Sequence, residues 1–454
     1  MTKNMTQGSP LKHILIFSLP LLVGNLFQQT YNMVDTAIVG QFLGAKALAG
    51  VGCSGGIQFL VLGFCIGICT GFSIPIAQRF GANDTDSMRQ YIFIGSISLC
   101  AFALVITTIC ALLCSTILTW MNTPQDIFSD AFSYLFIIFL GIPFMLLYNF
   151  LSGILRAVGD SKTPFVFLVI STVINVGLDL LFVLVIKFGV AGAALATVIS
   201  QALSGFLCLI YILKKFEVLH LRPENKKWDW LKCKNLIGMG VPMGLQFSIT
   251  AIGSMILQAA NNVLGSLYVS GFVAATKIKQ FLMCPYDAFG TAVSTYASQN
   301  YGAGNAKNIK KGIFQGTLIS VSYGIIASLI MLFFGKDLSK LFISSNESFI
   351  LSAAGKYTTI MGFFYWTLGI LNVLRPTVQG LGYSRTAMLS GVIEMIARCT
   401  VAFGFVPKFA YTAVCAADPI AWICANCFII PLTVYVIHKI SKTMEKTPLS
   451  NKKN

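Results

Sequence analysis

Residues 163–186 read TPFVFLVISTVINVGLDLLFVLVI, an almost unbroken apolar run that contains a single carboxylate, Asp179. The run exceeds the ~20 residues that a helix needs to cross the hydrocarbon core of a bilayer. A charge at that depth costs at least ~2.5 kcal/mol, so a membrane helix rarely keeps one without a partner and a task. The run therefore predicts a membrane-spanning helix whose acid faces protein or water rather than lipid.

The rest of the chain has the same character. Of its 454 residues, 56% are hydrophobic and only 11% are charged, and the mean hydropathy is +0.77, which no ordinary soluble domain of this length accommodates. Apolar runs of spanning length fall at 14–40, 47–77, 91–120, 131–155, 163–186, 189–213, 235–262, 270–298, 312–335, 350–374, 386–406 and 412–438. We therefore predict an all-α polytopic membrane protein with twelve transmembrane helices.

The net charge of +16 follows the predicted loops. If both termini are cytoplasmic, most Lys and Arg residues lie in cytoplasmic loops, as the positive-inside rule requires. The largest cluster, KKFEVLHLRPENKKWDWLKCK at 214–234, becomes a cytoplasmic linker in which we expect Cys233 to be accessible, and 439–454 becomes a basic cytoplasmic tail. No motif for RNA or DNA binding accompanies these charges, so we expect no nucleic-acid partner.

An internal repeat organises the chain. AQRFGAND at 77–84 is echoed by SQNYGAGN at 298–305, and VGDSKTP at 158–164 by LGYSRTA at 381–387, with offsets of 221 and 223 residues. These echoes predict two pseudo-symmetric six-helix lobes, 1–213 and 235–438. Repeats of this kind are typical of secondary transporters that rock two bundles around a central site.

A second carboxylate, Asp35, lies inside the apolar run 14–40, in the stretch GNLFQQTYNMVDTAIVG at 24–40. Asn25, Gln28, Asn32 and Asp35 recur at spacings of three or four, which places them on one helical face. Asn175 similarly precedes Asp179 by one turn. Two carboxylates in one low-dielectric site cannot comfortably both stay ionised, so such a pair holds a proton or recruits a hard cation through oxygen ligands.

Helix packing also leaves a pattern. GFCIGICTG at 63–71 puts Gly63, Gly67 and Gly71 on one face, which predicts a small-residue seam where another helix approaches closely. Pro20 and Pro242 occupy equivalent positions in the two halves, where they permit bending.

Together these motifs resemble the multidrug and toxic compound extrusion (MATE) family over essentially the whole chain. The resemblance rests on the opening FSLPLLVGNLFQQTYNMVDTAIVGQFLGAKALAGVG, the AQRFGA and SQNYGAGN turns, LRAVGDSKTP and LRPTVQGLGYSRTA. It implies a V-shaped fold of two six-helix lobes that exports varied, often cationic, compounds in exchange for protons or sodium. It also implies a site for the coupling ion, with sodium as the only metal, formed by Asp35, Asn175, Asp179 and Thr197.

The second half lacks this acidic pair. The repeat places Leu257 and Gln258 opposite Asp35, and Arg398 and Ala402 opposite Asn175 and Asp179. Glu394 lies one turn before Arg398 and either forms an ion pair with it or faces a central cavity. Lys279 and Asp287 are two turns apart, so we expect their partners on other helices. The residues predicted to line a substrate cavity are Gln28, Tyr31, Asn32, Gln246 and Glu394.

The expected function is secondary active export of small organic compounds by alternating access, in a bacterial cytoplasmic membrane and by a monomer in contact with lipids. No HExxH, GxSxG or P-loop motif is present, so we expect no catalytic residues, no enzymatic activity and no cofactor beyond the coupling ion. The alternative is a flippase for lipids or lipid-linked oligosaccharides. Such a flippase needs several cavity cations to hold a pyrophosphate, and the candidates in the second half are Lys277, Lys279 and Arg398.

Overall fold

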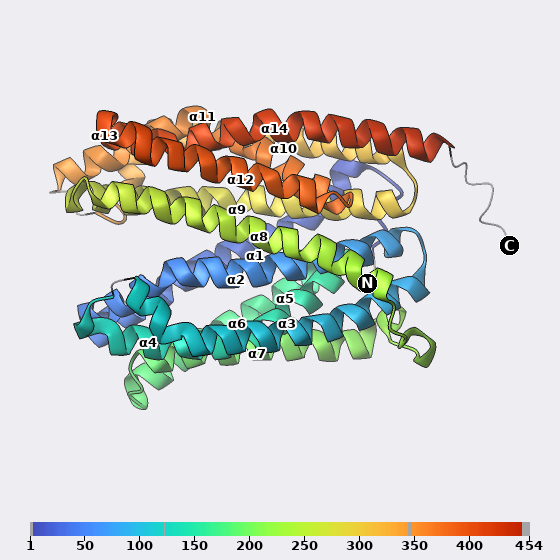
Figure 1. The fold of residues 1–454 in the computed structure, drawn as a ribbon, viewed down its shortest axis with the longest axis horizontal. Helices are drawn as coiled ribbons and strands as arrows, with labels where there is room; N and C mark the ends of the chain where they lie inside the picture. The colour runs from blue at the N-terminus through green and yellow to red at the C-terminus, as the bar shows by residue number, and fades with distance from the viewer. Residues whose placement is uncertain (1–2, 122, 344–346, 447–454) are drawn as a thin grey trace. The chain divides into compact units, whose positions relative to one another are not determined.

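The computed structural model describes residues 3–121, 123–343 and 347–446, and nearly all of them are helical, with no strand in these ranges (Figure 1). The α-helices are α1 (Pro10–Ile38), α2 (Gly44–Gly81), α3 (Thr85–Trp120), α4 (Gln125–Leu140), α5 (Ile142–Ala157), α6 (Lys162–Leu180), α7 (Val190–Lys215), α8 (Trp230–Asn262), α9 (Ser266–Gly302), α10 (Ala306–Ser339), α11 (Ser348–Gly380), α12 (Ser384–Thr400), α13 (Val406–Phe409) and α14 (Tyr411–Lys446). The shorter turns are three π-helices, η1 (Val39–Leu43), η2 (Leu181–Val185) and η5 (Val401–Phe405), and two 3-10 helices, η3 (Glu217–Leu219) and η4 (Pro223–Asn225).

The twelve predicted spans all fall on these helices, which confirms the fold class. Within the described ranges, ten helices are long and apolar enough to cross a membrane, and α4 with α5 forms an eleventh span. The remaining span is α9, which has ample length at 37 residues but carries Lys277, Lys279 and Asp287 in its interior. These charges lower the mean hydropathy of α9, so a criterion of length and composition alone does not identify α9 as a span.

One predicted span is not a single straight helix. The run expected at 131–155 is divided into α4 and α5, which meet at Gly141 with a bend of 45°. Pro143 lies in the first turn of α5. Its ring clashes with the carbonyl four residues earlier and it has no amide hydrogen to donate, so the helix cannot continue straight through this point.

The chain forms two compact units. Val23–Gly244, with the described residues before Met5, forms the first unit, and Met5–Leu22, with the described residues from Leu245 onward, forms the second. The division runs through α1 and α8, close to Pro20 and Pro242, where each helix can bend. The units thus differ from the predicted lobes 1–213 and 235–438 at the first half of α1 and the first part of α8, and the assignment of lobes stays a prediction.

Hydrogen bonds hold the N-terminal segment in the second unit. The Met5 amide donates to Gln299 of α9 at 2.9 Å, and the Asn300 side chain donates back to the Met5 carbonyl at 3.2 Å. Asn308 of α10 donates to the Thr6 carbonyl at 2.9 Å. This segment therefore belongs to the second unit even though the first unit contains the residues that follow it.

The glycine seam of α2 lies in the first unit. Gly67 faces Gly244 of α8, and Gly71 faces Gly240, so closely that a Cβ added to either α2 glycine would come within 2.6 Å of the α8 backbone. Only residues without side chains permit this approach. The predicted packing role is confirmed for these two glycines.

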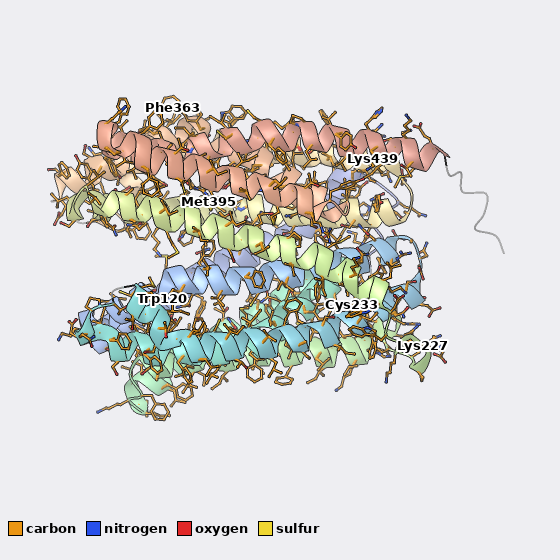
Figure 2. The ribbon with its side chains drawn as sticks, viewed as in Figure 1. Trp120, Lys227, Cys233, Phe363, Met395 and Lys439 are labelled. Atoms are coloured by element: carbon orange, nitrogen blue, oxygen red, sulfur yellow. The ribbon has the colours of Figure 1, made fainter. Side chains whose placement is uncertain are left out.

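The linker packs against the start of α3. Arg89 donates from Nε to the Val218 carbonyl at 3.1 Å and from Nη2 to the Glu217 carbonyl at 3.3 Å. Lys227 and Cys233 lie at one end of the first unit and Trp120 at the other (Figure 2). Cys233 is 2% exposed, with its sulfur 3.8 Å from Ser98 Oγ, so the expectation of an accessible thiol was wrong because the first turn of α8 packs against α3. Of the predicted basic tail, residues up to 446 continue α14, and 447–454 lie outside the described residues.

Candidate functional site

The four residues predicted to hold the coupling ion lie in the first unit, on three helices. Asp35 is on α1, Asn175 and Asp179 are on α6, and Thr197 is on α7. Asp35 is 8% exposed, Asn175 is 2% exposed and Asp179 is fully buried, while Thr197 is half-buried. The carboxylates of Asp35 and Asp179 are close enough to interact electrostatically. The structure thus brings the two acids together although 144 positions separate them in the sequence numbering.

The acids and the amide in this site lack hydrogen-bond partners among the described residues. Both carboxylate oxygens of Asp179, Oδ1 of Asp35, and both Nδ2 and Oδ1 of Asn175 are buried and unpaired. A buried polar group normally has a partner, and an unpaired one costs ~1–3 kcal/mol, more if it is charged. This concentration of unpaired oxygens indicates a site that a proton or a cation completes.

A tyrosine hydroxyl joins the site from α1. Tyr31, one turn before Asp35, is hydrogen-bonded to the Thr197 hydroxyl at 2.8 Å. The bond fixes where the Thr197 oxygen lies. Tyr31 was predicted to line the substrate cavity, and the structure also places it beside the carboxylates, with which it interacts electrostatically.

The sequence reasoning missed two further residues of this polar cluster. Tyr134 of α4 is buried, interacts electrostatically with Asp35 and Asp179, and is hydrogen-bonded to Gln58 of α2. Gln58 Nε2 in turn donates to the Ser54 hydroxyl at 2.9 Å. A glutamine within the apolar run 47–77 was the available signal, because polar side chains in spans avoid lipid.

Two π-helical turns shape the backbone next to the acids. η1 begins four residues after Asp35, and η2 begins two residues after Asp179. Such turns interrupt the regular pattern of backbone hydrogen bonds and occur frequently at functional sites. The two turns contact each other, and their buried residues Val39 and Val183 join an apolar cluster that also contains Tyr134. The acids are therefore bordered by close apolar packing on that side.

The donor set defines what the site can bind. Two carboxylates, an amide oxygen and a hydroxyl are all hard oxygen ligands, which suits a proton or a hard monovalent cation such as sodium. Within the described ranges, no group of three or more His, Cys, Asp and Glu side chains is placed to hold a metal ion. With two acids, the site has the charge to neutralise one proton and one further cation at most.

The residues predicted to line a substrate cavity are divided between the units. Gln28, Tyr31 and Asn32 lie on α1 in the first unit, where Gln28 and Asn32 are exposed. Gln246 and Glu394 lie in the second unit and are buried. Gln246 accepts a hydrogen bond from Gln379. A common cavity for all five stays a prediction.

Glu394 forms the predicted ion pair. Its Oε2 lies 3.3 Å from Nη2 of Arg398, one turn later on α12. Arg375 of α11 binds the other carboxylate oxygen, Oε1. Arg375 directly follows the predicted span 350–374, and the sequence alone does not single it out because Arg near the end of a span often reaches the membrane surface.

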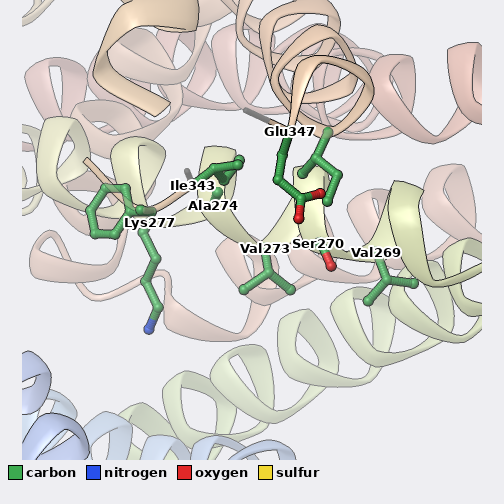
Figure 3. A pocket seen from close by; sticks show the side chains of 9 residues that line it. Val269, Ser270, Val273, Ala274, Lys277, Ile343 and Glu347 are labelled. Atoms are coloured by element: carbon green, nitrogen blue, oxygen red, sulfur yellow. The ribbon is translucent and has the colours of Figure 1, made fainter. Parts of the chain in front are cut away.

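An open pocket of about 530 Å³ lies elsewhere in the second unit, between α9, Phe342 and Ile343, and the start of α11 with Glu347 before it (Figure 3). Lys277 and Glu347 provide its charges, and its other lining residues are mostly apolar. It contains none of the predicted ion or substrate residues, and we assign it no part in the candidate site.

Membrane-crossing helices, an internal repeat and a buried acidic pair together define a membrane transporter. The family model MatE matches residues 20–181 and 242–403, one copy in each half. The probable multidrug resistance protein YpnP of Bacillus subtilis is 32% identical over 391 residues, which cover 86% of this chain and 87% of that protein. The chain therefore belongs to the MatE family of multidrug efflux transporters.

Two further comparisons agree. The probable multidrug resistance protein YoeA of Bacillus subtilis is 27% identical over 403 residues, covering 87% of this chain and 86% of that protein. A solved structure described as the outward-facing conformation of a multidrug resistance MATE family transporter superposes with a TM-score of 0.91 at 20% identity, covering 97% of this chain and 99% of that one. This likeness confirms the fold.

Proposed function

We propose that this protein is an antiporter that exports small organic compounds, often cationic, in exchange for protons or sodium bound between Asp35 and Asp179. The observation that carries the proposal is the burial of two interacting carboxylates whose oxygens are left unpaired. Structural ion pairs satisfy their acids, as Arg375 and Arg398 do for Glu394. The acids of the first unit have no such cation from the chain among the described residues, so an exchangeable one supplies the charge.

The coupling follows from electrostatics. Without a bound cation, two carboxylates in a low-dielectric site repel each other and lack the water that would solvate them. Binding of a proton or of sodium removes this cost and lets α1, α6 and α7 draw together. A conformation that packs these helices closely is then favoured with the ion bound, and its release favours the other conformation.

The neutral groups have distinct roles. Asn175 and Thr197 supply oxygens that complete a sodium shell, whereas a proton needs only a carboxylate. Tyr31 positions the Thr197 hydroxyl through the 2.8 Å hydrogen bond between them. Binding of sodium therefore depends on the Thr197 hydroxyl, whereas binding of a proton does not. A variant at Thr197 can thus distinguish the two coupling ions.

The substrate assignment rests on the names of the relatives, which are described as multidrug resistance proteins. Gln28, Tyr31, Asn32 and Gln246 are the proposed substrate contacts, whereas Glu394 is held by Arg375 and Arg398. The proposed setting is the bacterial cytoplasmic membrane, with both termini cytoplasmic and the protein monomeric.

The cations of the second unit argue against the flippase alternative. Arg398 is bound by Glu394 and Asp418, and Lys279 is bound by Asp418. Cations whose donor groups are already bound to carboxylates are poorly placed to hold a pyrophosphate. The exposed Lys277 is then the remaining candidate of the three predicted from the sequence, and one lysine is too few.

Dye efflux from proteoliposomes tests the proposal. We expect the natural protein to export a cationic dye when an inward gradient of sodium or of protons is imposed, and Asp35→Asn to lose this dependence. Thr197→Ala, compared with Thr197→Ser, should weaken sodium-driven efflux and leave proton-driven efflux nearly unchanged. Efflux by Asp35→Asn at the natural rate, with equal protein per vesicle, would refute the proposed site.

A further inference from the structure

A chain of buried charges crosses the second unit. Lys279 Nζ of α9 lies 2.7 Å from Asp418 Oδ2 of α14, and Arg398 Nε of α12 lies 2.8 Å from Asp418 Oδ1. Arg398 also binds Glu394, which Arg375 binds from the other side. We call these five residues the buried charge chain. Each of its two carboxylates lies between two cations. The three cations and two carboxylates of the buried charge chain therefore carry a net charge of +1.

Asp418 is at the centre of these contacts. Its two oxygens accept hydrogen bonds from Lys279 and Arg398, and the Tyr357 hydroxyl lies 3.4 Å from Oδ2. Asp418 is 4% exposed. Desolvating a carboxylate to this extent is unfavourable unless cations are bound to it, and here the ammonium of Lys279 and the guanidinium of Arg398 are those cations.

The repeat relates Asp418 to the candidate cation site of the first unit. The 221-residue offset places Lys279 opposite Gln58 and Asp418 opposite Thr197. The structure supports the second match, because α7 and α14 begin directly after Gly189 and Ala410, which both have positive φ and lie 221 residues apart. Thr197 and Asp418 are therefore equivalent positions on equivalent helices.

Two further pairs of residues correspond at the 223-residue offset. Tyr134 corresponds to Tyr357, and Asn175 corresponds to Arg398. Each tyrosine interacts with its own cluster, Tyr134 with Gln58 and Tyr357 with Asp418. A π-helical turn follows the matching helix in both units, η2 after α6 and η5 after α12. The two clusters thus occupy the same place in the two halves of the repeat.

The two clusters differ in which helices carry the acids and in whether the protein's own side chains supply the cations. In the first unit the acids are on α1 and α6 and no described residue supplies them with a cation, whereas in the second unit Leu257 and Gln258 lie opposite Asp35, and Ala402 lies opposite Asp179. In the second unit the acid is Asp418 on α14. Lys279 and Arg398 occupy the positions that correspond to the amides Gln58 and Asn175 of the first unit.

We propose that the buried charge chain is the second unit's counterpart of the cation site, and that the ammonium of Lys279 is a tethered cation that permanently occupies it. Asp418 is thus a binding carboxylate for a monovalent ammonium group, one that the chain itself supplies. The comparison of the two sites rests on the proposed cation site of the first unit, but the binding of ammonium by Asp418 does not.

Chemical rescue of Lys279→Ala tests this assignment. Removing the side chain beyond Cβ leaves Asp418 without one cation and opens room for a small alkylammonium ion. We expect the purified variant to have a lowered melting temperature, which ethylammonium chloride raises progressively with concentration. Ethanol and sodium chloride at the same concentrations should produce a smaller shift.

Two comparison variants make the result specific. Lys277→Ala, two residues earlier on the same helix and exposed, should show no ethylammonium-dependent shift. Asp35→Asn combined with Lys279→Ala should still be rescued, which separates this site from the one in the first unit. If Lys279→Ala is as stable as the natural protein, or if ethylammonium stabilises Lys277→Ala equally, the assignment is wrong.

A second variant covers the case in which Lys279→Ala does not fold. Lys279→Gln with Asp418→Thr installs the residues found at the equivalent positions of the first unit and removes both charges together. We expect this double variant to be recovered from membranes at a higher level than Lys279→Gln alone, because Asp418 is no longer left short of a cation and Arg398 keeps its pair with Glu394. An equal or lower level would overturn the proposed correspondence.

Discussion

Asp179 is a buried acid that has no hydrogen-bond partner among the described residues. Burial removes water from both of its carboxylate oxygens, and no described residue replaces that water. In the proposed function, the free energy of this site therefore depends on a proton or sodium ion that binds and is released. Glu394 is buried to a similar degree, but its two arginine partners make it a structural group instead.

The first prediction concerns the acidic pair. Asp179→Asn removes a charged ligand worth ~1.5–3 kcal/mol, which corresponds to ion binding weaker by ~10–100-fold. We expect Asp35→Asn to cost a similar amount and the double substitution to cost little beyond either single one, since the acids act as one site. Gradient-driven efflux and ion-dependent thermal stability measure the effect, and strictly additive losses would contradict a shared site.

The second prediction concerns Glu394. Glu394→Gln leaves Arg375 and Arg398 with less negative charge around them, and breaking a buried pair in this way costs ~3–5 kcal/mol. We expect a lower melting temperature and lower abundance, with the dependence of residual efflux on the ion gradient preserved. Asp337→Asn is the control, because its ion pair with Lys340 is exposed and such pairs contribute little. Loss of ion coupling in a stable Glu394→Gln protein would instead place Glu394 in the coupling site.

At the scale of helices, glycine decides how closely α2 and α8 approach. Gly67 and Gly71 leave room for the α8 backbone at Gly244 and Gly240, and both α8 glycines lie near Pro242. The contact therefore coincides with the part of α8 that can bend most easily. A helix that moves in transport needs such a surface, because side chains would interlock.

The third prediction tests this contact. Gly71→Val places atoms where the Gly240 backbone lies, and overpacking of this kind typically costs ~1–3 kcal/mol. We expect a reduced melting temperature and slower efflux. Gly52→Val and Gly55→Val on the same helix are matched controls, because a Cβ at either position meets nothing within 4 Å. Equal effects at all three glycines would show that helix propensity, not contact, is responsible.

At the scale of the molecule, charge placement sets the orientation in the membrane. The linker is ordered against α3, and its exposed lysines include Lys226 and Lys227.

Two compact units of similar helical composition carry unlike charge clusters, one with unpaired acids and one with an excess cation. This inequality is the basis of our proposal that the first half exchanges an ion and the second half holds a fixed internal pair.

The fourth prediction concerns orientation. A cysteine at the exposed Lys227, in the linker, should react with a membrane-impermeant thiol reagent in inverted vesicles and not in intact cells. The natural Cys233 is an internal control, because its burial against Ser98 should leave it unreactive in either preparation. Labelling of Lys227→Cys from outside intact cells would reverse the proposed topology.

The sequence by itself determined the class of the protein. Apolar runs of membrane-spanning length, the placement of Lys and Arg, and the offsets of 221 and 223 residues led to twelve helices in two related halves, because the bilayer imposes length and polarity on each helix separately. The same reasoning found Asp35, Asn175 and Asp179, since a charge in an apolar run is conspicuous on its own helix. The Glu394 and Arg398 pair was visible for the same reason, one turn apart.

Only the tertiary structure decided which polar groups meet across helices. Tyr134 and Gln58 join the acids from α4 and α2, and Asp418 joins Lys279 to Arg398, yet none of these contacts has a regular spacing in the chain. Burial of Cys233 likewise depends on how α8 packs against α3. Helix periodicity specifies the face on which a side chain lies, whereas its partner depends on the packing of distant helices, which each helix's own sequence does not encode.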